Sequence, residues 1–133
     1  MARILVVDDE PEILAMLKRL LTAEGYSVTD AMGGEKAKAV LETAEFDLMI
    51  SDIRMAPVDG MQLLEFAHAK YPSMSVIMLT AFGQVDTALK ALELGAFDYV
   101  KKPFSAETLL STIRKALECH EYMEQSDAEE RQA

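Results

Sequence analysis

Four short apolar runs along the chain are each followed closely by residues whose side chains could take part in chemistry, namely Asp8-Asp9, Asp52, Thr80 and Lys102. If these runs are neighbouring parallel strands, their carboxyl ends lie at one edge of a sheet and the polar side chains converge there. Three carboxylates brought together repel one another, and burying them is costly unless a cation compensates. The arrangement therefore predicts an acidic site for a hard divalent ion.

Magnesium prefers an octahedron of oxygen atoms at about 2.1 Å, which two carboxylates, a main-chain carbonyl, a substrate oxygen and waters can complete. A carboxylate beside such an ion can act as a nucleophile towards a phosphoryl group and form an aspartyl phosphate. The transfer needs in-line positioning and charge neutralisation, and a hydroxyl can hydrogen-bond an equatorial phosphoryl oxygen. Lys102 and Thr80 have the side chains that these tasks require.

The elements that position these residues follow from the hydrophobic pattern. Apolar runs predict strands over residues 4–7, 26–29, 48–50, 76–79 and 97–100. Apolar residues at helical spacing follow each of these strands, so that five strand–helix units result. Pro11 suits the first turn of the first helix, Gly25 ends it, and Ser105 can cap the last helix.

Strands that alternate with helices predict an α/β fold, a parallel sheet with helices on both faces, because each crossover must pack back onto the sheet. Five units are too few for an eight-fold barrel. We therefore expect an open, flavodoxin-like sheet of five strands in the order 2-1-3-4-5, covered by five helices. In such a fold the ligand site lies beyond the carboxyl ends of the strands.

Length and composition exclude several other classes of protein. The 133 residues suit one compact domain, and 13 basic against 23 acidic residues give a formal charge of −10, which disfavours direct nucleic-acid binding. The single cysteine, Cys119, permits no internal disulfide. No apolar stretch approaches the length of a membrane span, and the N-terminal segment reaches Asp8 too early for a signal peptide, so we expect a cytoplasmic protein.

Taken together, the motifs resemble the receiver domain of bacterial two-component response regulators. They are the acidic pair Asp8-Asp9, the segment DIRMAPVDG at 52–60, Thr80-Ala81, and the segment DYVKKPF at 98–104. Each is weak alone, but their order and their placement after successive strands are specific. The similarity covers about residues 3–118, and the second and fourth segments look like receivers of sigma-54-dependent transcription activators.

The resemblance implies a role for each residue of the acidic site. Asp52 corresponds to the phosphoacceptor, which a sensor histidine kinase would phosphorylate. Asp8, Asp9 and Asp52, with the main-chain carbonyl of Arg54, correspond to the ligands of Mg²⁺, for which Mn²⁺ could substitute. Lys102 would pair with the phosphoryl group.

The resemblance also implies a switch. Thr80 and Tyr99 correspond to a pair in which the hydroxyl moves to the phosphoryl oxygen and the aromatic ring turns inward. The response would leave through the surface of the helix over 85–92, the strand 97–100 and the helix that follows Ser105, which could form a homodimer or bind a partner. The output domain would lie outside this chain, and the Lys102-Pro103 bond would be cis, as in similar receivers.

One position departs from the usual receiver pattern, which has a proline four residues after the acceptor. This chain has Ala56 there and Pro57 next, while the spacing to Gly60 is kept. We expect the difference to tune the rigidity of the loop and the rate of dephosphorylation, since it removes no group that the chemistry requires.

Three other functions compete with this interpretation. A hydrolase with an aspartyl nucleophile usually has a second acid two residues later, where this chain has Arg54, so turnover of an external substrate is not expected. A flavin or nucleotide carrier would suit the fold, but the glycines form neither a G-x-G-x-x-G nor a Walker motif. The third is a receiver-like interaction module that is not phosphorylated; the intact acceptor, metal and lysine positions argue against it.

Simpler explanations exist for several residues. Asp8-Asp9 could cap the first helix, and Lys101-Lys102 could be a solvated pair, of which at most one side chain can enter the site. His68 and His120 have no partners at metal-ligand spacing, so we expect both at the surface.

The apolar stripe of the last helix fails near Cys119. We therefore expect a receiver domain over 1–120 and an acidic, solvated tail or truncated linker over 121–133. If the helix continues through Met123, it could serve as a dimerising linker.

Overall fold

The computed structural model describes residues 1–55, 58–81 and 83–132, and within these ranges side chains are described up to Gln125. Strands and helices alternate along the described chain, as predicted. The strands are β1 (Arg3–Asp8), β2 (Ser27–Met32), β3 (Leu48–Asp52), β4 (Ser75–Thr80) and β5 (Asp98–Lys101). The helices are α1 (Pro11–Ala23), α2 (Gly34–Thr43), α3 (Gly60–Lys70), α4 (Val85–Glu93) and α5 (Ala106–Gln132).

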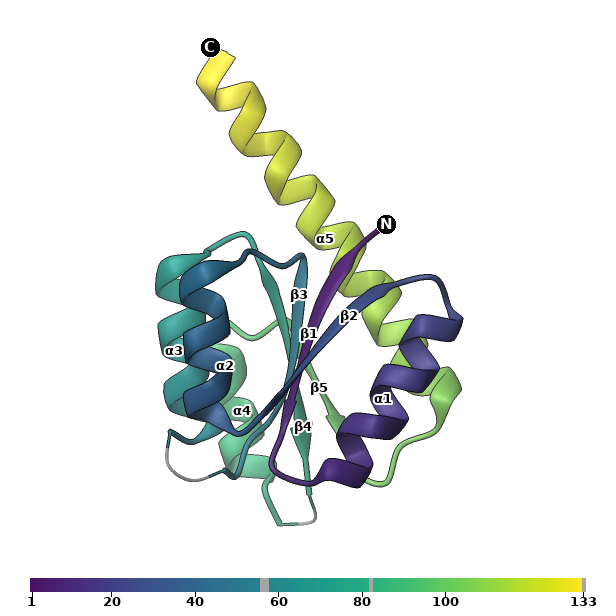
Figure 1. Ribbon diagram of the computed structural model, residues 1–133. Helices are drawn as coiled ribbons and strands as arrows, with labels where there is room; N and C mark the ends of the chain where they lie inside the picture. The colour runs from purple at the N-terminus through teal and green to yellow at the C-terminus, as the bar shows by residue number, and fades with distance from the viewer. Residues whose placement is uncertain (56–57, 82, 133) are drawn as a thin grey trace.

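The strands form one parallel sheet in the order β2-β1-β3-β4-β5, which confirms the predicted flavodoxin-like fold class. The register aligns Val7 with Ser51 and Asp52 with Leu79, so β1, β3 and β4 end at nearly the same level. Their carboxyl ends lie at the edge of the sheet opposite the projecting end of α5 (Figure 1).

Alternate strand residues fill two cores, one on each face of the sheet. Ile4 and Val6 lie in the core under α1 and α5, whereas Leu5 and Val7 lie in the core under α2, α3 and α4. Figure 1 shows the two groups of helices on opposite faces. All four side chains are fully buried, and each contributes about 1.5–3 kcal/mol by removal from water. The unbroken apolar runs of the sequence therefore reflect burial on both faces.

Local signals set several helix boundaries. Pro11 lies in the first turn of α1, and Gly25, with φ of 92°, follows its end. The Ser105 Oγ accepts a hydrogen bond from the Thr108 N–H at 3.1 Å, so Ser105 caps α5 as predicted. Asp59 and Gln62 form a reciprocal capping box at α3, which fixes where the helix begins after the acceptor strand.

The last helix is longer than the apolar stripe suggested. Leu109, Ile113 and Ala116 are buried, residues 121–125 are exposed, and the backbone stays helical to Gln132. The end of α5 projects from the body of the molecule (Figure 1). The C-terminal segment is therefore a continuing helix and not an irregular tail. The domain boundary near residue 120 stays a prediction.

Two further observations concern the chain as a whole. The Lys102-Pro103 bond is cis, as predicted. No helix in the described part of the chain is long and apolar enough to cross a membrane.

Candidate functional site

Two buried aspartates lie side by side in the sheet order, at the ends of β1 and β3. Asp8 is fully buried and Asp52 is 6% exposed, although ionised carboxylates are rarely buried without partners. The neighbouring β1–α1 turn adds Asp9, which is exposed, and the segment after β3 adds Arg54, also exposed. Parallel strands thus bring the acidic residues to the edge where the ligand site was predicted.

Lys102 joins the two buried carboxylates. Its Nζ lies 3.0 Å from Asp8 Oδ2 and 3.5 Å from Asp52 Oδ1. Its main-chain N–H donates to the carbonyl of Thr80 at 2.6 Å, which continues the β4–β5 pairing one residue past Lys101. Lys101 is exposed, so only Lys102 of the pair forms ion pairs with the buried acids, in accord with the argument that only one can enter the site.

Asp8 is held by two donors and does not cap α1. Its Oδ1 accepts from the main-chain N–H of Glu10 at 3.0 Å, and its Oδ2 accepts from Lys102. The residue that precedes α1 is Glu10, which has no side-chain capping bond. The simple explanation of Asp8 as a helix cap is therefore wrong, and its carboxylate belongs to the buried site.

The electrostatics of the site bear on its chemistry. Burial, and then the charge of Asp8, raise the pKa of Asp52, and the opposing effect of Lys102 only partly offsets them. Burial lowers the pKa of Lys102, but the hydrogen bond that its ammonium donates to Asp8 and the charges of Asp8, Asp52 and Glu10 outweigh this effect, so the pKa is raised. The site therefore retains an excess of negative charge that favours a further cation.

A cluster suited to such a cation is present. Asp8, Asp9 and Glu10 each offer a carboxylate oxygen, and these three atoms lie within 4.8 Å of one another. Oxygen donors of this kind are the ligands of hard divalent ions such as Mg²⁺. Glu10 was not among the predicted ligands, although its place directly after the acidic pair was the signal that could have indicated it.

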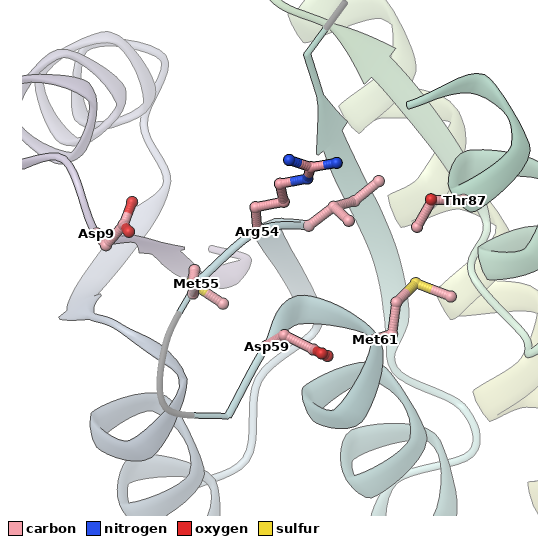
Figure 2. A pocket seen from close by; sticks show the side chains of 7 residues that line it. Asp9, Arg54, Met55, Asp59, Met61 and Thr87 are labelled. Atoms are coloured by element: carbon pink, nitrogen blue, oxygen red, sulfur yellow. The ribbon is translucent and has the colours of Figure 1, made fainter. Parts of the chain in front are cut away.

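A hollow beside this cluster is formed by four different segments. Figure 2 shows Asp9 from the turn after β1, Arg54 from the segment after β3, Asp59 at the start of α3 and Thr87 from α4 around it. The hollow is open to solvent on the side of these residues, so the acidic edge is accessible from outside the molecule.

The path of the chain after the acceptor depends on two glycines. A Cβ at Gly60 would lie 2.7 Å from the Cα of Ile53 and would overlap the carbonyl of Asp52. A Cβ at Gly34, at the start of α2, would overlap the carbonyl of Val58, which has φ of 58°. The segment after Asp52 is therefore packed closely against α2 and α3. Ala56 and Pro57, where the sequence departs from the usual receiver pattern, lie outside the described residues, so the expected effect on the loop stays a prediction.

The predicted switch residues border a second hollow. Thr80 is 2% exposed, Tyr99 is half-buried, and both line this hollow together with Val85 of α4 and Lys102. Sequence reasoning missed Gln84, which is buried and accepts a hydrogen bond from the main-chain N–H of Ala81 through its Oε1 at 2.6 Å. It shapes the turn that leads from Thr80 into α4.

One expectation about the histidines is wrong. His120 is 8% exposed, because α5 continues and carries it against the loop that precedes β4. His68 is half-buried beside Gly95. Neither position could be assigned from local pattern, since both depend on packing between elements.

A doubly wound parallel sheet with buried acids and a lysine at its carboxyl edge defines a class of α/β domain with a charged site at the strand ends. Within this class the chain belongs to the response regulator receiver domain family, whose sequence pattern matches residues 4–114. The predicted family and its fold are thereby confirmed. The protein is a receiver domain of two-component systems.

Individual relatives agree with this assignment. The transcriptional regulatory protein GlrR of Escherichia coli K12 is 43% identical over 117 residues, which cover 88% of this chain and 26% of GlrR. ZraR of Salmonella typhimurium is 41% identical over 86% of this chain and 26% of its own. A receiver domain structure from Clostridium thermocellum has a TM-score of 0.87 and 34% identity over 92% of this chain and 99% of that one. This chain thus spans about a quarter of the length of these curated relatives.

Proposed function

We propose that Asp52 accepts a phosphoryl group from the phosphohistidine of a sensor histidine kinase and that the chain acts as a phosphorylation-controlled switch. The observation that supports this most directly is the single ammonium of Lys102, shared at 3.0 Å and 3.5 Å by the buried carboxylates of Asp8 and Asp52. Such a group sits where a phosphoryl oxygen bound to Asp52 would need a positive partner.

The chemistry is a transfer between two nucleophiles. An Oδ of Asp52 forms a bond to phosphorus while the phosphorus–nitrogen bond of the donor breaks and its electron pair returns to the imidazole. Asp8, Asp9, Asp52 and the main-chain carbonyl of Arg54 would hold Mg²⁺, or Mn²⁺ in its place, which supplies positive charge to the phosphoryl oxygens. Lys102 stabilises the same charge from the β5 side.

The conformational response to phosphorylation would begin at Thr80 and Tyr99, which line the second hollow. The Thr80 hydroxyl moves to a phosphoryl oxygen, the ring of Tyr99 turns into the space behind it, and the surface of α4, β5 and α5 changes shape. Val85 and Leu89 of α4 are 52% and 49% exposed, which gives this surface an apolar face for a homodimer or a partner. The output domain would be carried outside this chain. The chain assists its own phosphorylation and does not turn over an external substrate.

The experiment that tests this proposal is the intact mass of the protein after incubation with acetyl phosphate, with and without Mg²⁺. The parent is compared with Asp52→Asn, and Asp59→Asn serves as a matched control because Asp59 lines the same hollow but caps α3. A single Mg²⁺-dependent phosphoryl adduct is expected on the parent and on the control, and none on Asp52→Asn.

Two results would overturn the proposal. An adduct that survives Asp52→Asn would place the acceptor elsewhere, and a parent that acquires no adduct with Mg²⁺ would leave the unphosphorylated interaction module as the function.

A further inference from the structure

His120 lies where α5 leaves the body of the molecule, at the edge of the sheet opposite the acceptor. Its Nδ1 lies 2.8 Å from the main-chain carbonyl oxygen of Ser73, and its Nε2 lies 2.9 Å from Oδ1 of Asp47. A second carboxylate, that of Glu124 one turn along α5, lies 3.8 Å from the same Nε2. The imidazole side chain is only 10% exposed, so water offers it few alternative partners.

The two ring nitrogens face groups that accept hydrogen bonds. A main-chain carbonyl cannot donate, so the Nδ1 must carry the proton that lies between it and Ser73. A neutral imidazole then presents a lone pair at Nε2, which would point at the oxygen of Asp47. Only the imidazolium ion, with a proton on each nitrogen, donates to both acceptors.

The position of Asp47 is set independently of His120. Its Oδ2 accepts from the main-chain N–H of Arg3 at 2.7 Å, and its own N–H donates to the carbonyl of Arg3 at 2.8 Å. Its carbonyl accepts from the N–H of Ser75 at 3.3 Å. The main chain of Asp47 is therefore held by the first residues of β1 and β4, and its carboxylate cannot turn away from the ring without losing the bond from the Arg3 N–H.

The charged and titratable groups around the ring come from every element packed there. Besides Asp47 and Glu124, the titratable groups that line the hollows bordering His120 are Glu121 of α5, Glu45, Lys70 of α3, Tyr71, Tyr26 and the N-terminal Met1. Among the residues with described side chains, the two charged groups within 4 Å of Nε2 are both carboxylates, and that of Glu124 also accepts from the Ser73 hydroxyl at 3.0 Å. The nearest charges favour the cationic ring.

We propose that His120 is an imidazolium ion in the folded protein and that this ion is a proton-dependent latch. The latch fastens the exposed, projecting part of α5 to the edge of the sheet away from Asp52. One turn earlier, the Ser75 Oγ donates to the carbonyl of Ala116 at 2.9 Å in a buried bond that does not depend on a proton. Loss of the His120 proton therefore loosens α5 from about this turn onward and leaves the core part of the helix in place.

The first test needs only the parent protein and ring ¹⁵N NMR. At a pH of about 7.5 an unperturbed imidazole is mostly neutral, so two protonated ring nitrogens at this pH identify an imidazolium ion that its surroundings stabilise. Both ring nitrogens of His120 are expected to show protonated ¹⁵N shifts, recorded beside the ring signals of His68. Assignment of the two signals uses His68→Gln. A His120 ring with one unprotonated nitrogen at this pH would overturn the proposal.

The second test measures the free energy of unfolding against pH for the parent, His120→Gln and Asp47→Asn. The stability supplied by the imidazolium is present at low pH and lost as pH rises. His120→Gln should therefore raise the unfolding equilibrium constant about tenfold at pH about 6 and under about threefold at pH about 8.5. The double variant should show that the two substitutions are not additive at the lower pH. A difference that does not depend on pH would contradict the latch.

A bound metal is the other way to occupy the Nε2 lone pair. The ring ¹⁵N spectrum is therefore recorded with and without EDTA. Unchanged His120 signals are expected, and signals that shift when the chelator is added would replace the proton by a metal ion and overturn the proposal.

Discussion

The Nζ of Lys102 lies 3.0 Å from Oδ2 of Asp8, a residue 94 positions earlier in the chain, and this bond closes the buried acidic site. Asp8 is fully buried, and the ammonium is also 3.5 Å from Asp52. The same side chain that is proposed to stabilise a phosphoryl group therefore also compensates the acids in the absence of phosphate. In the phosphorylated site the Lys102 ammonium would pair with a phosphoryl oxygen as well as with the acids. The chemistry is therefore coupled to the packing of β1, β3 and β5.

Replacement of Lys102 by Met is expected to lower stability as well as phosphorylation. Removal of one partner of a buried ion pair leaves Asp8 uncompensated, so the free energy of unfolding at pH 7 should fall by about 2 kcal/mol or more. Lys101→Met is the matched control, because Lys101 is exposed and should cost less than about 0.5 kcal/mol. Urea denaturation of both variants measures these free energies of unfolding. Equal stability of the two variants would show that the ion pair between Lys102 and Asp8 contributes nothing.

Replacement of Asp52 by Asn is expected to stabilise the protein at neutral pH when no divalent ion is added. Because the pKa of Asp52 is raised in the folded state, the ionised carboxylate favours the unfolded chain. The parent therefore loses stability as pH rises from below 3.8 through the raised pKa, whereas the Asn variant does not. Thermal denaturation from pH about 3.5 to 7 should show that the stabilities of the parent and the Asn variant diverge with increasing pH. Stabilities that converge would contradict a raised pKa of Asp52.

Magnesium is expected to stabilise the parent by mass action. At a concentration 100 times the dissociation constant, the gain is about 2.7 kcal/mol if only the folded state binds. Asp9→Asn should weaken Mg²⁺ binding at least tenfold, which corresponds to about 1.4 kcal/mol. Titration of Mg²⁺ against thermal stability also tests Glu10→Gln. A loss as large as that of Asp9→Asn would show that Glu10 is a ligand, and no loss from Asp9→Asn would contradict the proposed ligand set.

The close packing of Gly60 predicts a large effect from a single methyl group. Gly60→Ala places a Cβ 2.7 Å from the Cα of Ile53, so the backbone at the acceptor must move, at a cost of about 2–3 kcal/mol. Gly25→Ala is the control, because its Cβ meets no atom within 4 Å and only its φ of 92° opposes it, at about 1 kcal/mol. Chemical denaturation ranks the two, and the prediction fails if Gly25→Ala costs more.

The hydroxyl of Thr80 is expected to be needed for the response rather than for acceptance of the phosphoryl group. Thr80→Val keeps the buried shape without the donor, whereas Thr80→Ser keeps the donor. With beryllofluoride as the phosphoryl mimic, the amide NMR signals of α4 and of Tyr99 should shift in the parent and in Thr80→Ser. They should stay largely unchanged in Thr80→Val, and a full response there would remove the hydroxyl from the switch.

Much of the fold was predictable because its signals are local. The apolar runs before Asp8, Asp52 and Thr80 identified buried strands, and alternation with helices restricted them to a parallel sheet whose ends converge. The prediction was least accurate for the weakest apolar run, since β2 was expected over 26–29 and extends over Ser27–Met32. As an edge strand with one partner, it lacks the continuous apolar pattern of the central strands.

What only the tertiary structure decided are relationships that span the sheet. The ammonium of Lys102 lies between Asp8 and Asp52, the carbonyl of Val58 lies against Gly34, and His120 is buried between two acceptors, and each of these depends on the distance between separate segments. Sequence by itself determined which residue types stand at the strand ends, because periodicity and capping act within a few residues. Which atoms face one another depends on how the helices pack, and that energy is shared among residues far apart in the chain.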